Sequence, residues 1–279
     1  NANAVSLIPY AFVAIEKASV TYHNNKQWWG ESTLGIKACI KMAKEQQMKL
    51  MIKPHLWVNH QFYTGNLDFK TNQEWEKWET DYQKYILEFA QIAQDENVAL
   101  FCLGTELGNA IAKRPDYWLQ LILKIKTIYK GKLTYAANWD DFDKVPFWNQ
   151  LDYIGIDAYF PISENENPTV NELKKGWKKH LEKIETLEKK WHKKILFTEF
   201  GYRNSNFVGK EPWAENNAEI NNQAQANAYQ AFFETFKNKK WFAGCFVWKW
   251  YADEQYKRKK IDYTPQQKPA LEIIKQGYR

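Results

Sequence analysis

The 279-residue sequence predicts an α/β protein, and within that class a TIM (β/α)8 barrel, on three observations. Seven apolar segments of strand-like composition alternate with amphipathic helical patterns, which is typical of a parallel sheet covered by helices. No GxGxxG motif follows a predicted strand, so a dinucleotide-binding open sheet is not supported. Polar or aromatic residues end most of the predicted strands, and a barrel brings all its strand ends to one face.

The predicted elements run through the whole chain. Strands are expected where apolar segments are rich in β-branched and aromatic residues, at 5–13, 48–58, 97–106, 132–139, 151–159, 195–200 and 243–250. Helices are expected where apolar residues recur every three or four positions, at 32–47, 75–95, 115–129, 170–190, 217–237 and from 268 onward. Pro115 suits the first turn of its helix, and Gly131 lies just past the end of that helix.

The strand count is seven, whereas this barrel type has eight strands. We expect residues 1–279 to form a single catalytic barrel domain that is N-terminally incomplete. Its first βα unit is missing or lies before residue 1, unless a less obvious segment closes the sheet. If the first observed strand is barrel strand two, Glu106 ends strand four and Glu199 ends strand seven. Those strands face each other across a barrel.

Composition excludes several function classes. Hydrophobic residues make up 44% of the chain and charged residues 26%, which is typical of a folded globular protein. The formal charge of +6 is spread mainly over Lys-rich helices, and the one dense basic run, 257–260, is interpreted as a solvated loop. Without a basic face carrying aligned aromatic residues, no nucleic-acid partner is expected. No apolar run reaches membrane-span length, and no CxxC or HExxH motif is present, so neither a membrane span, a metal nor another cofactor is expected.

Two glutamates end predicted strands about three βα units apart. Glu199 follows the apolar stretch ILFT, and burial there without a partner would cost several kcal/mol, on the order of the penalty for an unpaired ion. Taken alone, it could belong to a structural ion pair. Glu106 follows VALFCLGT in the same way. Two such carboxyl groups are what glycosidic-bond hydrolysis requires, and a separation of about 5–5.5 Å belongs to the retaining mechanism.

The motifs around these glutamates resemble those of a known family. GTEL at 104–107 and FTEFGY at 197–202 are similar to the acid/base and nucleophile motifs of the TIM-barrel clan of retaining glycosidases. The wider pattern, from about Ile8 to Pro269, resembles glycoside hydrolase family 113, which consists chiefly of endo-β-1,4-mannanases: IPYAF, QWWGE, KPHLW, YAANWD, LDYIGIDAYFP and FVWKWY. The resemblance implies that Glu106 is the general acid/base and Glu199 the nucleophile, with no metal required.

Further residues at the strand ends are candidates for substrate binding: His55, Trp57, Thr105, Asn138, Trp139, Tyr159, Tyr202, Trp248 and Trp250. For Tyr159, the resemblance implies a hydroxyl hydrogen-bonded to the nucleophile, and a core position is the alternative. Trp248 and Trp250 are two apart on a predicted strand, so they should face the same side, either as a sugar-stacking floor or as core. Tandem Trp28 and Trp29 suggest either a sugar platform or packing under a loop. For Asp157 we expect a structural hydrogen bond.

One residue departs from the family pattern. Clan members usually carry Asn directly before the acid/base, where it contacts the sugar 2-hydroxyl, and here Thr105 occupies that position. The hydroxyl is a weaker substitute, so the preference for mannose stays open. The first hypothesis is a retaining hydrolase of β-1,4-linked mannan or manno-oligosaccharides, acting by double displacement. The alternatives are the same mechanism on β-glucan or xylan, and a non-catalytic carbohydrate-binding barrel. We expect a monomer outside the cytoplasm, secreted, periplasmic or surface-attached, because the substrate is a polymer.

Overall fold

The computed structural model describes residues 1–25, 27–58, 62–214, 219–252 and 260–278. The chain divides into two compact units. The N-terminal unit is Asn3–Gly155, and the C-terminal unit is Ile156–Arg279 together with Asn1–Ala2. Residues 257–259 of the predicted basic loop lie outside the described residues. Among the described helices, none combines the length and the apolar composition needed to cross a membrane.

All seven predicted strand regions contribute to one seven-stranded sheet. Its order is the order of the chain: β1 (Ala4–Leu7), β4 (Lys49–Ile52), β6 (Leu100–Thr105), β7 (Lys132–Asn138), β8 (Ile154–Asp157), β9 (Ile195–Phe200) and β10 (Phe242–Val247). The pairs β1–β4, β4–β6, β6–β7 and β9–β10 are parallel. Sequential parallel order is what the alternation of strands and helices predicted, because each helical crossover returns the chain to the next strand.

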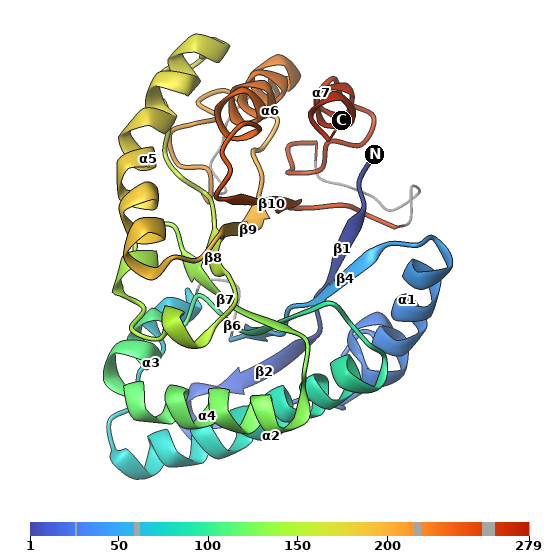
Figure 1. The fold of residues 1–279 in the computed structure, drawn as a ribbon, viewed down its shortest axis with the longest axis vertical. Helices are drawn as coiled ribbons and strands as arrows, with labels where there is room; N and C mark the ends of the chain where they lie inside the picture. The colour runs from blue at the N-terminus through green and yellow to red at the C-terminus, as the bar shows by residue number, and fades with distance from the viewer. Residues whose placement is uncertain (26, 59–61, 215–218, 253–259, 279) are drawn as a thin grey trace. The chain divides into compact units, whose positions relative to one another are not determined.

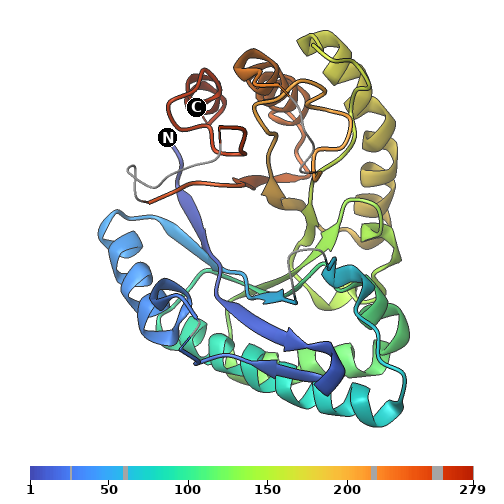
Figure 2. The same cartoon turned by 180° about the vertical axis from the view of Figure 1, so that it is seen from behind.

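Two of the predicted strands are each broken into two. Segment 5–13 forms β1 and then β2 (Tyr10–Ala14), and segment 48–58 forms β4 and then β5 (His55–Trp57). Pro9 and Pro54 stand at the breaks, and a proline cannot donate to a strand ladder. The second halves build a small separate sheet in the order β3 (Ser19–Thr21), β2, β5, which the sequence analysis did not predict. Figure 2 shows the dark-blue chain changing direction between β1 and β2.

The helices of the N-terminal unit are α1 (Thr33–Glu45), α2 (Asn72–Asp95), α3 (Gly108–Lys113) and α4 (Pro115–Ile128). Helix α2 buries the predicted aromatic face, including Trp78, Tyr82 and Phe89, and it packs beside α4 (Figure 1). It begins three residues earlier than predicted, because Thr71 and Glu74 form a capping box that stabilises the first turn. The short helix α3, between Glu106 and α4, was not predicted.

The C-terminal unit carries α5 (Val170–Trp191), α6 (Asn222–Phe236) and α7 (Ala270–Gly277). Helix α6 packs against both α5 and α7, and the three lie side by side in Figures 1 and 2. The core between these helices and β9 is aromatic: the ring of Phe200 stacks on Phe232 with centroids 3.8 Å apart, and Trp177 stacks on Phe197 at 6.1 Å. This packing fixes β9, the strand that carries Glu199.

Candidate active site

Glu106 occupies a turn directly after β6, in the N-terminal unit. Strand β6 is buried, and the exposure begins at Thr105 and Glu106, which are both half-buried. The Glu106 backbone N–H donates to the carbonyl of Ala136 on β7, at 2.8 Å. Its φ of 52° lies in the left-handed region, which side chains larger than glycine seldom adopt. Such strained positions gather at functional sites, and here the strain turns the chain from strand β6 toward α3.

Thr105 ties this turn to the neighbouring strand end. Its Oγ1 donates to the carbonyl of Pro54, at 3.4 Å, between β4 and β5. His55 and Trp57 follow on β5, His55 half-buried and Trp57 38% exposed. The Tyr10 ring meets the His55 ring edge-on, with centroids 5.2 Å apart. The structure therefore places Thr105, His55 and Glu106 at adjoining strand ends within one unit.

Asn138 and Trp139 lie at the end of the next strand, β7. Thr105 is paired with Ala136 across the sheet, so Asn138 stands two residues beyond the partner of Thr105. The Asn138 amide donates to Asp140 Oδ1 at 2.9 Å, and Trp139 is half-buried. Both predicted residues therefore stand at the same end of the sheet as Glu106.

A buried cation near this face was missed by the sequence analysis. Lys53 is fully buried at the end of β4, immediately before Pro54. Its signal was visible, since a lysine interrupts an otherwise apolar strand, but it was not singled out. A lysine is almost never fully buried unless it is paired.

Glu199 lies inside β9, in the C-terminal unit, with only 7% of its surface exposed. The Tyr159 hydroxyl donates to Glu199 Oε2 at 2.7 Å, so the hydrogen bond implied by the family resemblance is confirmed. Burial and then the nearby Glu199 carboxylate raise the pKa of Tyr159 well above its ordinary value. The phenol therefore keeps its proton at neutral pH and acts as a donor. A donor aimed at one carboxylate oxygen orients the group and favours its ionised form.

A second hydrogen bond lies behind this pair. Asp157, which is fully buried on β8, accepts a hydrogen bond from Thr198 Oγ1 at 2.8 Å. The Ala158 N–H donates to the Glu199 backbone carbonyl, also at 2.8 Å. These contacts join the segment carrying Tyr159 to the strand carrying Glu199. Asp157 thus has the structural hydrogen bond that was expected of it.

Tyr263 is a residue of this region that the sequence analysis missed. Its ring meets the Tyr159 ring edge-on, with centroids 5.9 Å apart, and its hydroxyl donates to the Pro212 carbonyl at 2.5 Å. Tyr263 lies outside the described helices and strands, where no periodic pattern could indicate a site. Tyr263 therefore packs against Tyr159 from a segment that the sequence analysis did not single out.

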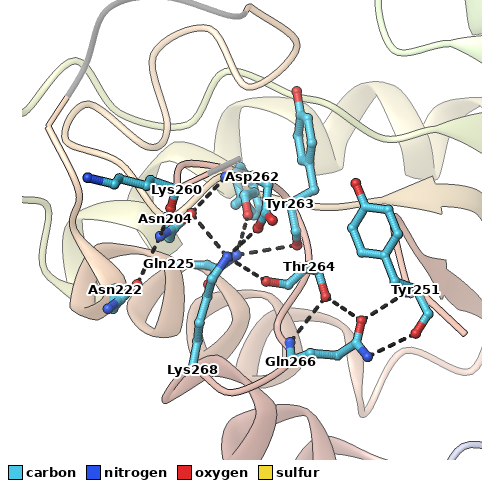
Figure 3. Close-up of polar contacts among 11 residues, drawn as sticks. Asn204, Asn222, Gln225, Tyr251, Lys260, Asp262, Tyr263, Thr264, Gln266 and Lys268 are labelled. Atoms are coloured by element: carbon cyan, nitrogen blue, oxygen red, sulfur yellow. Dashed lines mark hydrogen bonds and ion pairs between the residues drawn. The ribbon is translucent and has the colours of Figure 1, made fainter. Parts of the chain in front are cut away.

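A buried polar network holds the segment that carries Tyr263 (Figure 3). Lys268 forms an ion pair with Asp262, and its ammonium also donates to Asn204 Oδ1 at 3.1 Å and to the Thr264 carbonyl at 2.8 Å. The Asp262 N–H donates to the same Asn204 oxygen at 2.9 Å. Asn204 follows β9, so the network fastens the segment from Asp262 to Lys268 onto the chain leaving Glu199.

Trp248 and Trp250 differ from the prediction. Strand β10 ends at Val247, so both lie in the following loop and the two-residue alternation of a strand does not apply. Trp248 is half-buried and Trp250 is 59% exposed. The Trp248 carbonyl would lie 2.2 Å from a Cβ at Gly201, so only glycine fits there, and Trp248 lies beside the turn that follows Glu199. Trp248 thus stays near the predicted nucleophile, whereas Trp250 is mostly exposed to solvent.

Tyr202 does not lie on an open surface. It is fully buried, and its ring meets the Phe200 ring edge-on, with centroids 5.4 Å apart. A ring without exposed surface cannot stack on a sugar, so the expected sugar contact is replaced by a packing role. By contrast, Trp28 and Trp29 are 70% and 60% exposed, which contradicts the alternative that they pack under a loop.

Among the described residues, no group of three or more His, Cys, Asp or Glu side chains is placed to hold a metal ion. Two carboxyl groups stand at these strand ends: the half-buried Glu106 after β6 and the buried, hydrogen-bonded Glu199 on β9.

Comparison with known proteins identifies a family whose members share this fold. The model of Glycoside Hydrolase Family 113 matches residues 2–268. Two solved structures are titled as a complex structure of GH113 β-1,4-mannanase and as a structure of GH113 β-1,4-mannanase. They are 25% and 26% identical to this chain, each with a TM-score of 0.86, and each match covers 99% of this chain and 87% of theirs. The GH113 β-mannanase AaManA from Alicyclobacillus acidocaldarius, in complex with ManMIm, is 22% identical with a TM-score of 0.87, over 99% of this chain and 86% of its own. A search of curated proteins found no match.

These findings confirm the predicted TIM-barrel fold class and the resemblance. The matched region includes both glutamate motifs and all seven strands of the main sheet. The chain therefore belongs to Glycoside Hydrolase Family 113 and is a glycoside hydrolase.

Proposed function

We propose that this glycoside hydrolase cleaves β-1,4-mannosidic linkages in mannan or manno-oligosaccharides, with retention of anomeric configuration. Glu106 acts as general acid/base and Glu199 as nucleophile. The titles of the similar structures, which describe β-1,4-mannanases, support the substrate class. The positions of the two glutamates at the ends of β6 and β9 support their roles.

The observation that carries the mechanism is the hydrogen bond from Tyr159 to Glu199 Oε2. A nucleophilic carboxylate must be ionised and held in one orientation, and a buried phenol that keeps its proton provides both conditions. A tyrosine donor leaves the negative charge on the carboxylate, where it can attack.

In the first step Glu199 attacks the anomeric carbon while Glu106 gives its proton to the glycosidic oxygen, and the bond between that oxygen and the anomeric carbon breaks. In the second step Glu106 takes a proton from water, the water oxygen bonds to the anomeric carbon, and the bond to Glu199 breaks. Glu106 changes protonation state twice in each cycle. Its half-buried position gives it access to solvent protons, unlike the buried Glu199.

Substrate binding falls to the side chains around these two groups. In the N-terminal unit we assign His55, Trp57, Thr105, Asn138 and Trp139, and in the C-terminal unit Tyr159, Trp248 and Trp250. The exposed faces of Trp57 and Trp250 suit stacking on sugar rings, since their indoles combine an apolar face with a polar edge. A polymeric substrate implies that the enzyme works outside the cytoplasm, and we propose that it acts as a monomer without a metal.

Anomeric analysis of the products tests this proposal. Proton NMR during hydrolysis of β-1,4-mannan should show the β-anomer first, with the α-anomer appearing only through mutarotation. The α-anomer first would contradict retention. The same assay on β-1,4-glucan and xylan decides the substrate, because faster cleavage of either would replace mannan. Calorimetric binding of these polysaccharides without any product would favour a carbohydrate-binding barrel instead.

A further inference from the structure

Strand β6 carries one residue more than its neighbour β7 just before Glu106. The register between the two strands shifts after Cys102 and resumes at Thr105. Over this interval residues 103–104 of β6 lie opposite the single residue Tyr135 of β7. An extra residue of this kind bends its strand and re-aims the side chains that follow, and such irregularities are common beside active sites. The irregularity therefore sets the direction in which the backbone of Glu106 leaves the sheet.

Two buried tyrosines bond the backbone on either side of Glu106. The hydroxyl of Tyr82, on α2, donates to the Leu103 carbonyl at 3.0 Å. Directly after Glu106, the Leu107 N–H donates to the hydroxyl of Tyr135 at 2.7 Å. Both tyrosines are fully buried, and burial raises the pKa of each phenol well above its ordinary value, so both stay protonated at neutral pH. The mechanism proposed above uses neither of them.

Gly104 lets both tyrosine rings lie against the strand. A Cβ at this position would lie 2.8 Å from the Tyr82 hydroxyl and 3.2 Å from Cε2 of Tyr135. The Trp118 ring, on α4, meets the Tyr82 ring edge-on with centroids 5.8 Å apart and the Tyr135 ring at 5.9 Å. Tyr82 also stacks on Trp78 at 4.9 Å. Rings packed on several sides hold their hydroxyl groups in one place, so the two hydrogen bonds define the path of the backbone.

Gly108 brings a further group close to the same turn. A Cβ at this position would overlap Asp141 Oδ2, so this carboxyl group lies against the first residue of α3. Burial, reinforced by the charge of Asp140, raises the pKa of Asp141 to about 6. The backbone from Gly104 to Gly108 is thus enclosed at both ends, with Glu106 in its middle.

We propose that Tyr135 and Tyr82 are positioning residues for the acid/base, which hold Glu106 through its backbone rather than through its carboxyl group. The Tyr135 hydroxyl fixes the peptide group between Glu106 and Leu107, and so maintains the left-handed turn described above. Without this bond the turn relaxes, and the Glu106 carboxyl group moves away from the glycosidic oxygen that it must protonate. The inference rests on the proposed function and adds to it the residues that set the geometry of proton transfer.

Leaving-group dependence tests the inference, because only a departing oxygen that needs a proton depends on the position of Glu106. Tyr135→Phe keeps the ring and removes the hydroxyl. The substrates are a manno-oligosaccharide and an aryl β-mannobioside whose leaving group is an acidic phenol. The parameter is kcat/KM, which reports the steps up to departure of the leaving group. We expect Tyr135→Phe to lose at least about tenfold more on the oligosaccharide than on the aryl glycoside. Tyr82→Phe should show the same selectivity with a smaller factor.

Tyr129→Phe is the matched control. The buried Tyr129 hydroxyl also donates to a backbone carbonyl, that of Val98 at 2.7 Å, but this bond lies just before the opposite end of β6. The variant therefore loses a comparable hydrogen bond in the same unit without touching the turn at Glu106. It should change kcat/KM on the two substrates by the same factor, and thermal unfolding should show a loss of stability like that of Tyr135→Phe.

Equal changes on the two substrates in Tyr135→Phe, or the same selectivity in Tyr129→Phe, would overturn the positioning role. If circular dichroism shows that Tyr135→Phe does not fold, Tyr82→Phe decides by the same criterion. Failure of the proposed function would look different. Glu106→Ala would then itself show no selectivity between the substrates, or the wild-type protein would cleave neither, and the positioning role would fall with it.

Discussion

The two glutamates are held in opposite ways. Glu199 lies within a regular strand, is almost fully buried and receives a hydrogen bond from Tyr159. Glu106 lies just past a strand, half-exposed, on a backbone in the left-handed region. The difference matches the proposed division of labour, because a nucleophile needs one fixed orientation and a steady charge, whereas an acid/base must exchange protons with its surroundings.

Alanine substitution of each glutamate should give the largest losses of activity and should separate the two roles. Glu199→Ala should reduce kcat by about 10³-fold or more on every substrate, because the covalent step is lost. Glu106→Ala should lose about 10²–10⁴-fold on oligosaccharides, which need a proton on the departing oxygen. On an aryl glycoside with an acidic phenol, which leaves without help, the first step of Glu106→Ala should be much less impaired.

Azide separates the two roles further. It should restore turnover in Glu106→Ala with a β-glycosyl azide as product, and in Glu199→Ala it should yield the α-glycosyl azide. Identical responses of the two variants to leaving group and azide would show that the assignment of roles is wrong. Circular dichroism spectra like that of the wild type would confirm that both variants fold.

The polar network behind Glu199 predicts the largest effect on stability. Lys268 and Asp262 are paired with only 13% and 7% of their side chains exposed, so Lys268→Met would leave a buried carboxylate without its cation. We expect a loss of about 3–5 kcal/mol in the free energy of unfolding. Urea denaturation followed by tryptophan fluorescence measures this loss.

The matched control is Lys174→Met in the same unit. Lys174 pairs with Glu234 where the two side chains are 36% and 40% exposed, and such pairs contribute at most about 1 kcal/mol. Equal losses in the two variants would mean that the network does not fasten the segment carrying Tyr263.

Removal of the Tyr159 hydroxyl should have a smaller effect, confined to catalysis. Tyr159→Phe deletes a hydrogen bond to a charged group, which is worth about 1.5–3 kcal/mol, so kcat/KM should fall by about ten- to a hundredfold. Tyr202→Phe is the control, since the buried Tyr202 hydroxyl has no hydrogen-bond partner among the described residues. A similar decrease in both variants would indicate a general loss of packing rather than a loss of orientation at Glu199.

The smallest expected effect is the pH dependence of stability that Asp141, in the N-terminal unit with Glu106, contributes. The pKa of Asp141 is about 6 in the folded protein, above its ordinary value of 3.8, so folding favours the protonated form. Stability should therefore fall as pH rises from about 4 through 6 and change no further above that. Asp141→Asn removes this loss, and its advantage over the wild type should grow from near zero at pH 4 to at most about 3 kcal/mol at pH 8. An advantage that is independent of pH would contradict the shifted pKa.

Regular elements were predictable where one local pattern dominates. Strand β9 matches the predicted 195–200, because six consecutive residues there are buried and apolar apart from Thr198 and Glu199. The breaks at Pro9 and Pro54 had a visible signal, which the continuous apolar runs outweighed. The end of β10 at Val247 had none, since Trp248 and Trp250 are as compatible with a strand as the residues before them.

Contacts between distant segments were not predictable from local patterns. The hydrogen bond between Tyr159 and Glu199 was expected only through the family resemblance, and the contact of Tyr263 with Tyr159 was not expected at all. The approach of Asp141 to Gly108 at the start of α3 is likewise encoded by no spacing in the sequence. Such contacts follow from how loops fold over strand ends, and loop conformation carries no periodic signal.

The left-handed backbone at Glu106 has an evolutionary consequence. Glycine adopts this conformation without penalty, whereas a residue with a Cβ carries a cost of about 1–2 kcal/mol. In a lineage that no longer needs hydrolysis, selection for stability would therefore drive position 106 toward glycine. Among homologues of this chain, glycine at that position would mark descendants that have kept the barrel and abandoned the reaction.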